Sequence, residues 1–140
     1  MIKIYAPTRD NVVTGNYVTA KRYAYHLQNL GHRVFACNGF EEKVNAEGVR
    51  CAFVLHAEKG FHIIKELVAK NVPVVLVLTG TDLYKDIFST KNSKKEHCLK
   101  SIHLASAIVV LHKNAVSDLL KVVSLPRDRI FVVLQSVVDF

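Results

Sequence analysis

One stretch near the middle of the chain, Val74 to Tyr84, constrains the fold more than any other. Five consecutive apolar residues follow Pro73, three of them valines, and they run into a polar turn that contains Gly80. A short unbroken apolar run bounded by proline and glycine is typical of a strand buried on both faces. Such strands belong to parallel sheets covered by helices, so this stretch predicts an α/β fold.

The rest of the chain supports this interpretation, because strand-like and helix-like segments alternate along it. We expect strands over residues 2–6, 33–37, 51–55, 74–78, 107–111 and 129–134. We expect helices over residues 17–30, 61–70, 94–105 and 114–122, and a mobile loop over 86–93. The predicted fold is a Rossmann-like, doubly wound parallel sheet of about six strands, forming a single domain over residues 1–140.

The composition indicates a globular chain, since half of the 140 residues are hydrophobic and 22% are charged. No apolar run reaches about 18 residues, and the first residues resemble a strand rather than a signal peptide. Cys37, Cys51 and Cys98 are odd in number and far apart. These features predict a cytoplasmic protein with buried, reduced cysteines. Neither C-x-x-C nor H-E-x-x-H occurs, so we expect no metal site.

The formal charge of +7 favours anionic partners such as a phosphate, a nucleotide or a membrane surface. The densest cluster of basic residues in the sequence consists of Lys91, Lys94, Lys95 and Lys100. Aromatic residues do not alternate with these lysines, so we do not expect the protein to bind nucleic acid. A solvent-exposed loop and helix face explains the cluster equally well, and peripheral contact with a membrane stays open.

Ligands of open α/β sheets bind beyond the carboxyl ends of the strands, so residues that follow a strand are candidates for chemistry. Gly15 and Asn16 follow the first strand and precede a helix, where free N–H groups favour a phosphate or sugar phosphate. The alternative is a plain turn with an asparagine cap. The chain has no G-x-G-x-x-G or Walker A motif, which argues against a nicotinamide-dependent dehydrogenase and a P-loop enzyme.

Two further strand ends carry polar residues at the same expected edge. His56 follows the third predicted strand, where an imidazole can bind a hydroxyl or phosphate oxygen or transfer a proton. A lone histidine at a strand end is more often structural. Thr79, Gly80 and Thr81 end the central strand and are candidate substrate contacts. Asp82 either binds sugar hydroxyls or caps the helical turn that follows.

These stretches form an ordered set that resembles the N-terminal domain of retaining GT-B glycosyltransferases, which use nucleotide sugars. In pattern the set is most similar to the selenosugar synthases of selenoneine biosynthesis. Their typical basic pair after Leu-His-Ala is replaced here by Glu58-Lys59. The motifs that carry the resemblance are Gly15-Asn16 with Thr19-Ala20, Leu30 to Val34, Leu55-His56-Ala57, Leu78 to Tyr84 with Asp86, Ala107 to Leu111, and Gln135-Ser136.

The resemblance implies half of a two-domain enzyme that transfers a sugar from a nucleotide sugar, expected to be a UDP-sugar. This half would hold a small-molecule or anionic acceptor. A C-terminal donor domain, or a partner subunit in its place, would bind the nucleotide. On this basis we expect His56 and Asp82 to be catalytic, residues 15–16 and 79–81 to bind substrate, and residues 135–140 to begin an interdomain linker. The chain alone would be inactive.

Two other classes of function stay open. The sequence is also compatible with a non-catalytic binding subunit or scaffold of a split transferase, in which case turnover depends on another protein. It is also compatible with an unrelated Rossmann-like nucleotide-binding protein. The absence of a dinucleotide-binding motif argues against that second alternative.

Overall fold

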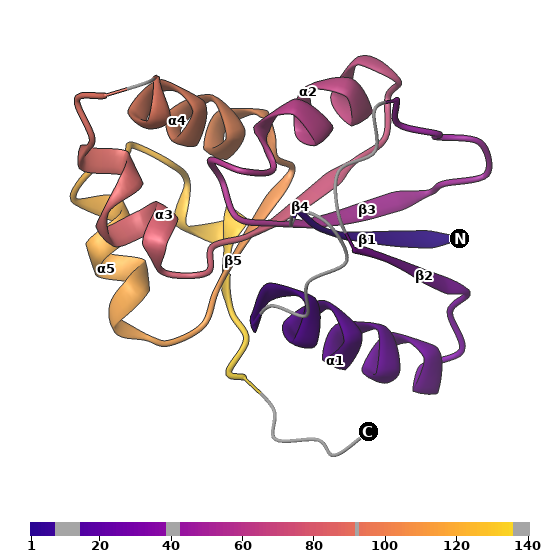
Figure 1. Cartoon of the computed structure of the whole chain (residues 1–140). Coiled ribbons are helices and arrows are strands. Elements are labelled where there is room, and N and C mark those ends of the chain that lie inside the picture. The colour runs from indigo at the N-terminus through magenta and orange to yellow at the C-terminus, as the bar shows by residue number, and fades with distance from the viewer. Residues whose placement is uncertain (8–14, 39–42, 92, 136–140) are drawn as a thin grey trace.

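The strands predicted from the apolar runs form one parallel sheet. The computed structural model describes residues 1–7, 15–38, 43–91 and 93–135. The sheet has six strands in the order β2-β1-β3-β4-β5-β6, and every neighbouring pair is parallel (Figure 1). The strands are β1 (Ile2–Ala6), β2 (Val34–Asn38), β3 (Cys51–Leu55), β4 (Val74–Val77), β5 (Ala107–Val110) and β6 (Ile130–Val132). The predicted α/β fold with a Rossmann-like parallel sheet is confirmed.

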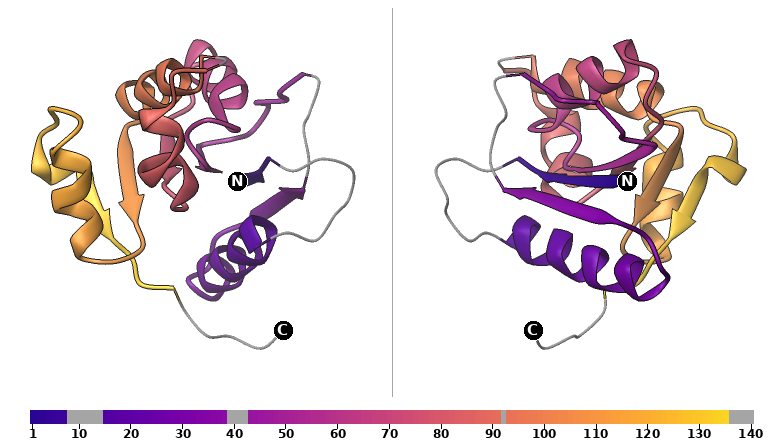
Figure 2. Two further views of the ribbon diagram at one scale, coloured as in Figure 1. Left: turned by 60° about the vertical axis from the view of Figure 1, so that its left-hand side comes forward. Right: turned by 90° about the vertical axis from the view of Figure 1, so that its right-hand side faces the viewer.

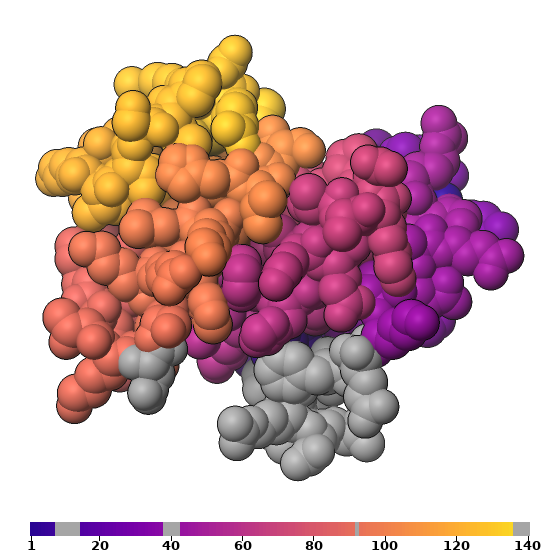
Figure 3. All heavy atoms as spheres, turned by 90° about the horizontal axis from the view of Figure 1, so that it is seen from above, coloured from indigo at the N-terminus to yellow at the C-terminus, as the bar shows by residue number. Residues whose placement is uncertain are grey.

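Helices cover both faces of the sheet. Helix α1 lies on one face, and α2, α4 and α5 pack on the opposite face (Figures 1 and 2). On that second face α2 and α4 lie side by side (Figure 3). The α-helices of the described residues are α1 (Gly15–Asn29), α2 (Phe61–Ala69), α3 (Thr81–Tyr84), α4 (Lys94–Leu104) and α5 (Asn114–Leu120), with 3₁₀ helices η1 (Asp86–Phe88) and η2 (Arg127–Arg129).

Most predicted boundaries agree with the structure, and the differences have physical causes. Strands β1 and β3 occupy the predicted residues, whereas β6 is shorter than predicted because Arg129 belongs to η2 and the pairing with β5 ends at Val132. The predicted loop over 86–93 is wrong for its first three residues. Asp86 and Ile87 are buried in η1, where Ile87 joins the core under α4. The three cysteines have free thiols, with Cys37 and Cys98 buried and Cys51 half-buried.

Gly60 lies where the chain leaves β3 and turns into α2, and this position has no room for a side chain. A Cβ atom on Gly60 would lie 2.5 Å from Cγ1 of Val54 and 2.7 Å from the carbonyl oxygen of His56. The N–H of Gly60 donates to that same carbonyl at 2.9 Å. This tight turn fixes the path of the chain immediately after His56.

We predict that Gly60→Ala lowers the free energy of unfolding by about 1–3 kcal/mol, because the added methyl group overpacks the turn. Urea denaturation measures the change. Gly15→Ala is the matched control, since a Cβ atom there meets nothing within 4 Å; we expect its effect to stay within about 0.5 kcal/mol. Equal stability of the two variants would contradict the close packing at Gly60.

Candidate functional site

The sheet reverses its winding between β1 and β3, and the candidate residues gather at this edge. These strands are neighbours in the sheet although α1 and β2 separate them in the sequence. Ligands of such sheets bind beyond the carboxyl ends of the strands at the switch point. Gly15 and Asn16 begin α1, His56 follows β3, and Thr79 and Gly80 follow β4. The parallel sheet therefore brings these strand ends to one edge, as the sequence predicts.

Asp82 holds two of these strand ends together. Its side chain is buried in α3, with the residue only 1% exposed. The carboxylate accepts four backbone N–H groups, from Ala57 (2.9 Å), Thr79 (3.1 Å), Gly80 (3.0 Å) and Leu83 (2.9 Å). These donors occupy the lone pairs that a carboxylate offers. Asp82 thus has a structural role that joins the loops after β3 and β4, and a direct contact between Asp82 and a substrate stays a prediction.

The turn that Asp82 braces leaves its other residues accessible. Gly80 has a φ of 121°, a backbone conformation that residues other than glycine rarely adopt. Thr79 and Gly80 are half-buried and Thr81 is exposed. On the α1 side, Gly15 is exposed and Asn16 is half-buried. The residues predicted to bind substrate are therefore open to a ligand, although no observation tests their binding.

His56 is buried behind the edge rather than facing solvent. It is 2% exposed and has a φ of 78°, which is unusual for a residue other than glycine. Its Nδ1 accepts the N–H of Lys59 at 3.0 Å, so the neutral ring carries its proton on Nε2. Nε2 lies 3.5 Å from Oδ2 of Asp86 and has no hydrogen-bond partner among the described residues. Residues held in such strained conformations cluster at functional sites.

The surroundings of His56 keep the imidazole neutral. Burial lowers its pKa below the usual 6.5, and the nearby ammonium group of Lys59 lowers it further. The carboxylates of Asp82, Asp86 and Glu58 oppose this shift without cancelling it. Because the ring is buried, a proton transfer between His56 and a substrate would require the residues around it to move. The catalytic role predicted for His56 is untested.

His56, Glu58 and Asp86 form a group whose possible ligand atoms all lie within 4.8 Å of one another. A histidine that binds a metal almost always donates a hydrogen bond from its other ring nitrogen. Here Nδ1 accepts a hydrogen bond instead, so Nε2 keeps its proton and offers no lone pair to a cation. The ammonium group of Lys94, 4.0 Å from Oδ1 of Asp86, adds a positive charge. This donor set does not fit a metal ion.

A second polar cluster, which the sequence analysis missed, lies at the ends of β4 and β5. The hydroxyl of Tyr84 donates to Oδ2 of Asp118 at 2.7 Å and lies 3.3 Å from Nε2 of His112. Nδ1 of His112 accepts the N–H of Ala115 at 3.2 Å. His112 follows β5 closely, just as His56 follows β3, so the rule that singled out His56 also identifies His112.

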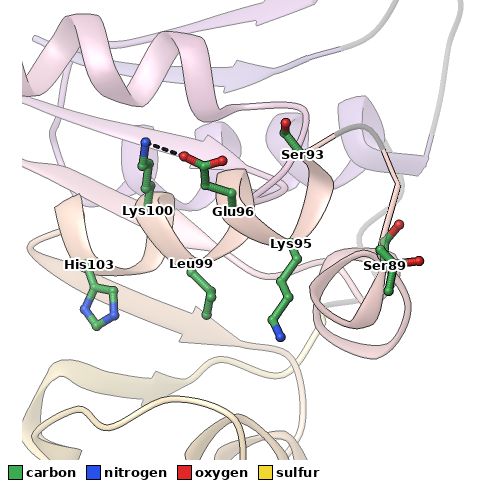
Figure 4. A pocket seen from close by; sticks show the side chains of 8 residues that line it. Ser89, Ser93, Lys95, Glu96, Leu99, Lys100 and His103 are labelled. Atoms are coloured by element: carbon green, nitrogen blue, oxygen red, sulfur yellow. Dashed lines mark ion pairs between the residues drawn. The ribbon is translucent and has the colours of Figure 1, made fainter.

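An open groove of about 420 Å³ runs along α4, within the predicted basic cluster (Figure 4). Lys95, Leu99 and His103 project to one side of the helix, and Glu96 pairs with Lys100 at 2.7 Å. Glu96 and Lys100 are both exposed, so their ion pair adds little to the stability of the helix. These contacts agree with a solvated helix face, and membrane contact remains untested.

No known family model matches the chain, and no curated protein matches it. The likeness to GT-B glycosyltransferases therefore rests on the sequence motifs alone. Part of the Gln-Ser motif and of the predicted linker, residues 136–140, lies outside the described residues. None of the described helices is both long and apolar enough to cross a membrane.

We predict that Asp82→Asn lowers the free energy of unfolding by roughly 2–3 kcal/mol. The amide replaces one acceptor oxygen with an NH₂ group, which cannot accept a hydrogen bond from the backbone N–H groups that it faces. Urea denaturation at neutral pH measures this loss. Asp128→Asn, at an exposed position in η2, is the matched control and should change stability little. A stable Asp82→Asn variant would show that the four N–H groups find other acceptors.

We also predict that the folded chain loses stability as the pH falls below about 6.5. The pKa of His56 is lowered in the folded chain, so the unfolded chain takes up a proton that the folded chain excludes. One such group changes the free energy of unfolding by at most about 1.4 kcal/mol per pH unit. Asparagine tolerates a positive φ, so His56→Asn should keep the backbone conformation and reduce the dependence of the free energy of unfolding on pH. His103→Asn on the exposed face of α4 should not, and identical slopes in the two variants would contradict the assignment.

Proposed function

We propose that this chain is the acceptor-side domain of a glycosyltransferase that uses a nucleotide sugar, with a UDP-sugar as the expected donor. The observation that carries the proposal is the set of accessible groups on the carboxyl edge. Gly15 and Asn16 lie at the start of α1, and Thr79, Gly80 and Thr81 follow β4. The ordered motifs that resemble GT-B enzymes add support from the sequence.

The start of α1 suits the phosphates of a nucleotide sugar. The helix has 15 residues, and its first turn contains no acidic side chain. The N–H groups that open a helix point along its axis, and together with the helix dipole they favour an anion at this end. When the bond from the sugar to its diphosphate breaks, the electron pair leaves with the diphosphate. Stabilising that developing negative charge is the contribution we assign to Gly15 and Asn16.

His56 and Asp82 enter this proposal as positioning residues rather than as groups that touch substrate. Both are at least 98% buried, and the Asp82 carboxylate is occupied by backbone donors. Their role is to fix the loops after β3 and β4, so that Thr79 and Thr81 meet the acceptor or the sugar in a constant geometry. Catalysis of this kind depends mostly on such positioning.

A second domain or partner subunit is part of the proposal. The edge strand β6 and the residues after it expose large apolar side chains, Phe131 (52%), Val133 (41%) and Leu134 (65%). The next residue, Gln135, reaches back to α1, where its Nε2 donates to Oγ1 of Thr19 at 3.4 Å. An exposed apolar strip near the proposed site favours a protein contact there. The same strip supports the alternative of a non-catalytic binding subunit.

A titration of the ¹⁵N-labelled chain with UDP-glucose, followed by amide chemical shifts, tests the proposal. We expect binding in the millimolar range, because half of the cleft is supplied by another domain. The shift changes should centre on residues 15–16 and 79–81. Asn16→Ala should weaken binding several-fold, since it removes a polar contact at the phosphate site. Asn29→Ala, at the far end of α1, should leave binding unchanged.

Two outcomes would contradict the proposal. Tight binding of NAD in place of UDP-glucose would favour an unrelated nucleotide-binding protein. Shift changes confined to the α4 groove would place anion binding away from the carboxyl edge and exclude Gly15 and Asn16 as the phosphate site.

A further inference from the structure

Tyr84, His112 and Asp118 come from three separate elements and meet at the carboxyl ends of β4 and β5. Tyr84 ends α3, His112 lies in the loop after β5, and Asp118 belongs to α5. Their contacts form a chain, from the hydroxyl of Tyr84 to Asp118 at 2.7 Å and between that hydroxyl and Nε2 of His112 at 3.3 Å. The cluster adjoins the Thr79–Thr81 turn but is separate from the start of α1.

The direction of each proton in this chain follows from its partners. Nδ1 of His112 accepts the N–H of Ala115, so the neutral ring carries its proton on Nε2. The hydroxyl of Tyr84 donates its hydrogen bond to Asp118, so its oxygen is an acceptor toward His112. Partial desolvation of the phenol, together with the hydrogen bond to Asp118 and its negative charge, raises the pKa of Tyr84 to about 12, so the phenol keeps its proton at neutral pH. The cluster therefore presents one N–H donor and one oxygen acceptor side by side.

A hollow of about 60 Å³ opens beside this donor and acceptor, with room for a few water-sized groups. Its lining combines polar residues, including Thr79, Tyr84 and His112, with apolar residues, including Leu83 and Val110. None of the residues that line the hollow carries a formal charge when His112 is neutral. The negative charge of Asp118 behind Tyr84 disfavours an anion. A neutral group that combines hydroxyls with C–H faces fits best.

We propose that Thr79, Tyr84 and His112 form a subsite for the hydroxyl-bearing edge of a neutral sugar, with Asp118 as the positioning residue for Tyr84. This inference rests on the proposed function and deepens it, because it separates a sugar subsite at β4 and β5 from the phosphate site at α1. A sugar hydroxyl would accept a hydrogen bond from Nε2–H of His112 and donate one to the oxygen of Tyr84. The 3.3 Å contact that it replaces is long for a hydrogen bond, so little is lost on binding.

The test follows the ring resonances of His112 and Tyr84 by NMR while the chain is titrated with D-glucose, D-galactose, N-acetylglucosamine and, separately, inorganic phosphate. We expect at least one sugar to shift both rings and phosphate to shift neither. Tyr84→Phe and His112→Gln should each raise the Kd for that sugar about 2- to 10-fold, the value of one hydrogen bond. His103→Gln, an exposed histidine on α4, is the matched control and should leave the Kd unchanged.

Asp118→Asn separates positioning from simple structural support. It should weaken sugar binding and also lower the pH at which Tyr84 ionises, measured by ultraviolet absorbance, because Asp118 accepts the phenol proton. Asp118→Glu should restore both properties in part. Weaker binding without a change in the Tyr84 titration would overturn the positioning role of Asp118.

The result also distinguishes this inference from the proposed function. If UDP-glucose shifts the amides of residues 15–16 while no sugar shifts His112 or Tyr84, the subsite is wrong and the proposed function stands. If a sugar shifts the two rings but UDP-glucose leaves residues 15–16 unchanged, the subsite stands and the phosphate site is wrong. Phosphate shifting His112 in place of a sugar would overturn the assigned class of ligand.

Discussion

The candidate site depends on one buried carboxylate. Asp82 accepts N–H groups from the end of β3, from the turn after β4 and from its own helix, so a single side chain fixes the relative positions of two strand ends. Hydrogen bonds to a charged group are among the stronger ones in proteins, and burial strengthens them further. The tight turn at Gly60 and the strained backbone of His56 belong to the same braced region.

Much of the fold could be predicted because it follows from local pattern. The unbroken apolar runs of β3 and β4 indicate strands buried on both faces, and their alternation with helical patterns indicates parallel pairing. The start of η1 could not be predicted, because Lys85-Asp86-Ile87 has the composition of a loop. Asp86 and Ile87 are buried only through long-range packing under α4, which no short sequence window contains.

The candidate site could be located from the sequence, but the roles of its residues could not be assigned. Position after a strand identified His56 and Asp82 without indicating whether their side chains point toward a ligand or into the protein. The structure gives both side chains an inward orientation and leaves Thr79 and Thr81 accessible. His112 follows a predicted strand just as His56 does, but nothing in the sequence alone shows that Tyr84 and Asp118 lie beside it.

The occupied carboxylate of Asp82 has a consequence for how such a domain can diversify. The side chains that maintain the loops are shielded from ligands, whereas Thr79 contributes only its backbone N–H to that bracing and its side chain stays accessible, as do Thr81 and His112. Effects of substitutions at separate, independent positions are close to additive. The chain can therefore acquire a new ligand preference through a few surface replacements while keeping its stability, so the braced edge is a favourable starting point for directed evolution.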